Sequence, residues 1–103
     1  RRISQQSTDL AMAMVQAQRA AEAWKAADGD PYAAAEWLGG CAREDEITLE
    51  FGPGWQPGPG ESAYALVATL SREGELARAA IAVRSGAQEI YRLDVAHRAG
   101  GSP

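Results

Sequence analysis

The chain opens with RRISQQSTDLAMAMVQAQRAAEAWKAAD (Arg1–Asp28), a stretch without glycine or proline that is rich in strong helix formers. We therefore predict one long helix over residues 3–28. Its apolar residues recur at steps of three and four and form a stripe on one side: Ile3, Leu10, Met14, Ala17, Ala21 and Trp24. Such a helix is roughly 37 Å long at about 1.5 Å per residue, which exceeds what a small domain needs for its own core. We expect the C-terminal half to pack in the core and the N-terminal half to contact something else.

A stop signal and a second helix follow directly. Asp28-Gly29 ends the first helix, because glycine adopts the left-handed conformation that helix C-termini use. Asp30-Pro31 combines a preferred N-cap with a preferred first helical residue, so a two-turn helix should run from residue 32 to Leu38. Trp24 and Trp37 lie one on each helix, and we predict that they pack near each other as core anchors.

From residue 46 the apolar period changes from helical to two, which indicates strands. Four such segments cover residues 46–51, 64–70, 77–84 and 91–95; a longer loop follows the first, and short turns join the others. Strands that follow each other through short turns pair antiparallel. The sequence therefore predicts an α+β fold, with the two helices packed on one face of a four-stranded antiparallel meander sheet. We expect a single domain over residues 1–98 and a disordered tail at residues 99–103.

The segment GPGWQPGPG, residues 52–60, is too rich in glycine and proline to join a sheet ladder and is predicted to be an irregular loop. Trp55 at its centre has two interpretations. It is either a lid folded back over the sheet edge or the helix, or a contact for a partner subunit.

Composition excludes several classes of function. A net charge of −4 with scattered basic residues argues against nucleic acid, because phosphate binding needs clustered Lys and Arg. Cys41 is the only cysteine, so no disulfide can form within the chain. The only histidine, His97, lies near the other end of the sequence, and a cysteine nucleophile needs a positioned base. We predict no catalytic site, no cofactor and no metal site.

Residues 7–30 resemble the region just after the membrane segment of type IV pilin-like proteins, most closely minor pilins and pseudopilins. In that family a Gln-rich and Ala-rich helix ends in an Ala-Glu-Ala-aromatic-Lys-like run, here AEAWK at residues 21–25, and leads into a short antiparallel sheet. The likeness covers residues 4–38, and the order of helix and meander extends it loosely to Ala96.

This resemblance implies a structural subunit of a type IV pilus, competence or type II secretion-like filament. It implies a prepilin whose leader, peptidase cleavage site and apolar first half of the helix lie upstream of Arg1. Its partners are other pilin or pseudopilin subunits, and it sits in the cell envelope or an extracellular filament after anchorage in the membrane. The chain begins with Arg rather than Met, so we expect a soluble piece cut inside a longer helix, monomeric when isolated.

The exposed part of the apolar stripe would then be the assembly interface, working by helix packing without chemistry on a substrate. The residues assigned to it are Ile3, Leu10, Met12, Met14 and Val15, with Trp55 as a candidate partner contact.

Two other classes stay open. Residues 21–38 also resemble the helix-turn-helix opening of nuclear-transport-factor-like domains, so a cone-shaped or cystatin-like domain that binds a small ligand is the alternative. Its polar dyad could come only from His97 and Asp94, which face opposite sides of a strand at this spacing. A generic interaction module fused to an upstream partner is the third class. A flat sheet with a projecting helix favours the filament, and a curved sheet around a cavity favours the ligand binder.

Overall fold

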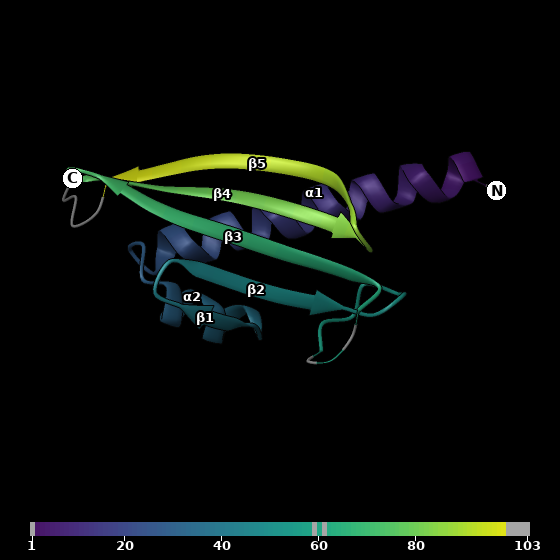
Figure 1. Ribbon diagram of the computed structural model, residues 1–103, viewed down its shortest axis with the longest axis horizontal. Helices are drawn as coiled ribbons and strands as arrows, with labels where there is room; N and C mark the ends of the chain where they lie inside the picture. Colours follow the sequence, from purple (N-terminus) through teal and green to yellow (C-terminus); the bar gives the residue numbers. More distant parts are fainter. Residues whose placement is uncertain (1, 59, 61, 99–103) are drawn as a thin grey trace.

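The computed structural model describes residues 2–58, 60 and 62–98, with the backbone alone for residues 2–6. Two helices precede five strands (Figure 1), namely α1 (Arg2–Ala26), α2 (Pro31–Leu38), β1 (Cys41–Arg43), β2 (Glu46–Phe51), β3 (Tyr64–Glu73), β4 (Leu76–Ser85) and β5 (Gln88–Arg98). The predicted α+β class is confirmed. The predicted tail at residues 99–103 lies outside the described residues.

The strands form one sheet in the order β1-β2-β3-β4-β5, and every neighbouring pair is antiparallel. The meander is therefore as predicted, but the count of four strands is wrong. The additional strand β1 pairs Cys41 with Thr48 and Arg43 with Glu46, and only two residues separate it from β2. Three residues are too few to show a period of two, so the sequence pattern could not reveal this strand.

The helix ends follow the capping signals. The Gly29 amide donates to the Trp24 carbonyl (2.9 Å), and Asp28 itself has a positive φ of 56°. Asp30 caps α2, since its carboxylate accepts a hydrogen bond from the Tyr32 amide (3.0 Å). Gly39 ends α2 in the left-handed conformation. Both helices are thus within a few residues of their predicted bounds.

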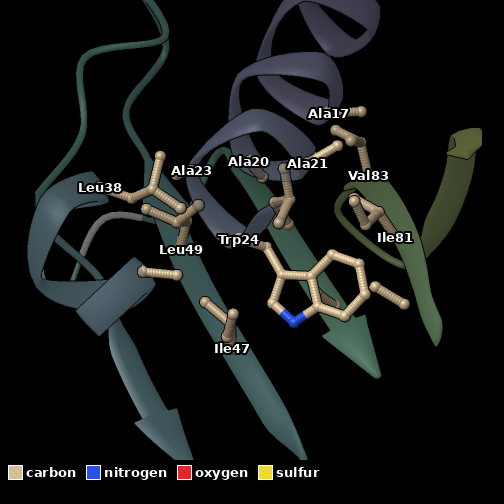
Figure 2. Close-up of a cluster of buried hydrophobic side chains, with 14 of the residues drawn as sticks. Ala17, Ala20, Ala21, Ala23, Trp24, Leu38, Ile47, Leu49, Ile81 and Val83 are labelled. Carbon is tan, nitrogen blue, oxygen red and sulfur yellow. The ribbon is translucent and has the colours of Figure 1, made fainter. Parts of the chain in front are cut away.

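The core lies between one face of the sheet and the two helices. Figure 2 shows the Trp24 indole reaching from α1 between Ile47 of β2 and Ile81 of β4, with Leu38 of α2 beside Leu49. Trp24 is 2% exposed, which confirms its role as a core anchor.

Trp37, in contrast, is 79% exposed. The prediction that it is a core anchor is therefore wrong. The buried side of α2 consists of Ala34, Ala35 and Leu38. At about 100° per residue, position 37 falls roughly a quarter turn outside that side and faces solvent.

The N-terminal part of α1 extends past the end of the sheet (Figure 1). Among the side chains described, burial on α1 begins at Ala13 and continues to Trp24 at positions that share one face. The expectation that the C-terminal half of the helix packs in the core is therefore confirmed, and the exposed apolar residues Leu10, Met14 and Val15 precede or flank that half.

Candidate assembly surface

The predicted interface residues on α1 do not form one patch. Leu10, Met14 and Val15 are 44%, 37% and 53% exposed, whereas Met12 is partly buried against the core. Leu10 and Met14 are four residues apart and lie on one flank. Val15 is about 100° further round the helix, on the side turned away from the sheet. The side chain of Ile3 lies outside the described residues.

The flank formed by Leu10 and Met14, which we call the α1 flank, faces the β4–β5 side of the sheet. It continues the line of Ala17 and Ala21, which lie beside Val83 and Ile81 of β4 in Figure 2. A hollow of about 390 Å³ joins it to the β4–β5 hairpin. The residues that line this hollow are Asp9, Leu10, Ser85, Gln88, Glu89 and Ile90. The α1 flank and the start of β5 are thus neighbours on the surface.

A hydrogen bond fixes α1 to the sheet where its exposed part begins. The Tyr64 hydroxyl of β3 donates to Asp9 Oδ1 at 2.8 Å. Tyr64 is 8% exposed, and its burial raises the pKa of the phenol above the usual 10.0, with the hydrogen bond to Asp9 as a second cause. The direction of α1 relative to the sheet therefore depends in part on a protonated tyrosine.

This raised pKa predicts a loss of stability in alkali. Well below pH 10.0 the Tyr64 phenol is protonated in the folded and in the unfolded chain, so the stabilisation that the protonated phenol provides is fully present. As the pH rises, the unfolded chain loses the proton first, and the contribution is lost as the pH passes through the higher pKa of the folded state. Urea denaturation at a series of pH values above 9 should show a steeper decline for the native chain than for Tyr64→Phe. Equal slopes for the two proteins would contradict this role of Tyr64.

Trp55 is folded back onto the sheet. It is 6% exposed and stacks on Tyr64, with ring centroids 3.8 Å apart and planes 12° apart. The Phe51 ring also packs on Trp55, with ring centroids 5.6 Å apart and planes 50° apart. The structure therefore has the lid arrangement. Little of the ring is left for the alternative role as a partner contact, because Tyr64 covers its face.

A second apolar surface, which the sequence interpretation missed, lies between α1 and α2. Exposed Trp37 borders a hollow of about 630 Å³ there. The lining residues are Arg19, Glu22, Ala23, Ala26, Trp37 and Leu38. The signal that could have revealed it is the position of Trp37 outside the side of α2 that carries Ala34, Ala35 and Leu38.

The remaining candidates for chemistry are dispersed. His97 Nε2 lies 2.7 Å from Asp28 Oδ1 and not beside Asp94, which faces the opposite side of β5 as the spacing predicts. Cys41 is a free, exposed thiol. Within residues 2–58, 60 and 62–98 there is no group of three or more metal-ligating side chains. In the same described part of the chain, no helix is long and apolar enough to cross a membrane.

Comparison of the chain with protein-family models, with curated proteins and with solved structures finds no match.

Proposed function

We propose that the chain is the soluble domain of a minor pilin or pseudopilin, a structural subunit of a type IV pilus, competence or type II secretion-like filament. The observation that carries the proposal is the α1 flank, the exposed apolar pair Leu10 and Met14, which lies where α1 meets the end of the sheet. The N-terminal part of α1 continues from there past the sheet (Figure 1). Two apolar side chains one helical turn apart, next to a projecting helix end, form a surface that a neighbouring helix can cover.

The resemblance of residues 7–30 to the helix that follows the pilin membrane segment supports the same proposal. In such a filament the helices pack side by side without covalent chemistry, and the sheet domains lie outside. The α1 flank would contact helices of neighbouring pilin or pseudopilin subunits. The subunit would sit in the membrane through an upstream apolar helix before assembly and in the envelope or extracellular filament afterwards.

The packing between helix and sheet favours this proposal over a cone-shaped ligand binder. Large side chains that are at most 2% exposed fill the space that a ligand would need: Trp24, Ile47, Leu49, Phe51, Leu66, Ile81 and Val83. The hollows described above lie on the outside of this cluster. One more, of about 310 Å³, lies beside Trp24 and Gly29, at the rim of the core.

The sequence encoded directly before Arg1 tests the proposal. We predict at least about 18 consecutive apolar residues that continue α1, because such a length is needed to span the bilayer as a helix. The resemblance further implies a glycine before the peptidase cleavage site and a glutamate soon after it. A start methionine or a polar domain at this point would rule out the filament function.

A further inference from the structure

The outer edge of β5 is the most open part of the sheet. β5 is the last strand in the described order and has 11 residues, whereas β1 at the opposite edge has three. Natural sheets protect long edges with proline, lysine, bulges or a covering element. β5 contains neither proline nor lysine, and its charged residues lie on the exposed outer face. Its one irregularity in pairing lies near its start, where β4 shifts register between Val83 and Arg84.

The inner face of β5 is also incompletely covered. Ile81 of β4 is 1% exposed, but its direct neighbour Leu93 is only half-buried, and Tyr91 and Val95 are half-buried as well. An apolar row on an open edge is a template for another strand. We propose that two copies of this chain dimerise by antiparallel pairing of their β5 edges about Leu93, which joins two five-stranded sheets into one of ten strands.

The charges of β5 indicate that the occupant is a second copy. When two copies of one strand pair antiparallel, residues directly opposite each other point to the same face of the sheet. The pair is therefore centred on one residue, which lies opposite its own copy. Centring on Leu93 places Arg92 of each copy opposite Asp94 of the other, on the outer face where both side chains are exposed. Arg92 also pairs with Glu89 of its own strand (Nη2–Oε1 3.0 Å), so in the dimer it would have one carboxylate from each copy near it. Opposite charges directly across a strand pair are stabilising. The dimer thus contains two complementary pairs.

Most other registers are unfavourable. Centring on Arg92 or on Asp94 would place that residue opposite its own copy, and like charges in this position are destabilising. Centring on Val95 would place Arg92 opposite Arg98. The register about Leu93 avoids all three conflicts.

A register centred on Ala96 also pairs Asp94 with a basic residue, Arg98. On the inner face, however, it sets Val95 against His97, whose ring already lies 2.7 Å from Asp28. The register about Leu93 instead brings Leu93 onto Leu93 and covers the remaining half-exposed apolar side chains. Apolar burial therefore favours the register about Leu93.

The dimer requires neither a filament nor the α1 flank, so its test is independent of the proposed function. Sedimentation velocity of the chain from about 10 µM to about 1 mM should show a monomer–dimer equilibrium, and not the monomer alone that the filament resemblance implies. Asp94→Arg should weaken it about tenfold or more, because two attractive pairs become repulsive. The double variant Arg92→Asp, Asp94→Arg restores the opposite charges of the register about Leu93, and it should dimerise again. A monomer at every concentration, or no effect of Asp94→Arg, would overturn the proposal.

Cross-linking locates the two-fold axis. In a Cys41→Ser background, Leu93→Cys should form an intermolecular disulfide on mild oxidation, since directly opposite residues have Cα atoms about 4.5–5.5 Å apart, within disulfide range. The matched variant Ala96→Cys should stay largely unlinked. Equal or faster cross-linking at position 96 would overturn the register about Leu93. The charge variants alter exposed side chains only, so they test the dimer even if Leu93→Cys folds poorly.

Discussion

Trp24→Ala is expected to lower the free energy of unfolding by about 3–5 kcal/mol, the range for removal of a large buried aromatic side chain. Trp24 is 2% exposed and lies between Ile47 and Ile81 in Figure 2. Its ring also meets that of His97 edge-on, with centroids 6.0 Å apart. The indole connects α1 to strands on both sides of the sheet centre, so alanine would leave a cavity that no single neighbour can fill.

Trp37→Ala is the matched control, because it removes the same side chain from the other helix. With 79% of Trp37 exposed, we expect a change within about 0.5 kcal/mol, as for most surface substitutions. Urea denaturation followed by far-ultraviolet circular dichroism measures both values. A loss below about 1 kcal/mol for Trp24→Ala would show that the tryptophan is not the core anchor described above.

The sequence predicted those parts of the fold that depend on local signals. The caps at Asp30 and Gly39 set the bounds of α2, and the alternation of apolar residues located β2, β3 and β4 within a few residues of their observed bounds. It failed where three-dimensional packing decides. β1 is too short to show the two-residue alternation of a strand, and its position beside β2 depends on the turn at residues 44–45.

Trp37 and Trp55 show the same limit for large side chains. Trp37 lies in an Ala-rich helix and is 79% exposed, whereas Trp55 lies in a loop rich in glycine and proline and is 6% exposed. Trp55 is buried because Tyr64, nine residues later in the sequence, lies in a neighbouring position of the fold and stacks on it. Helical geometry could have placed Trp37 outside the buried side of α2. No local sequence pattern predicts that Trp55 stacks on Tyr64 across a loop.

The candidate surface was predictable only in part. Periodicity places Leu10 and Met14 on one flank, and both are exposed. It could not show that Met12 packs on the core, nor that the flank adjoins the hollow at Ile90, because these depend on the angle at which α1 crosses the sheet. The bond between Asp9 and Tyr64 helps to set that angle, and it joins residues that are 55 positions apart.

Leu10→Glu is expected to abolish filament assembly while it leaves the isolated domain folded. Leu10 is 44% exposed, so the substitution should change the free energy of unfolding by no more than about 1 kcal/mol. In a filament the same carboxylate would be buried against a neighbouring helix, and an unpaired charge in an apolar contact is strongly unfavourable. Ala26→Glu is the control, because it adds the same charge at an exposed position of α1 that lies about 160° round the helix from Leu10, outside the α1 flank.

The most direct measurement is the amount of this subunit in filaments sheared from cells that make the full-length protein. For a pilin-like subunit with its assembly surface on the α1 flank, Ala26→Glu should be recovered with the filaments and Leu10→Glu should be absent from them. Recovery of Leu10→Glu at the native level, in a protein shown to be folded, would contradict an assembly role for the exposed flank of α1.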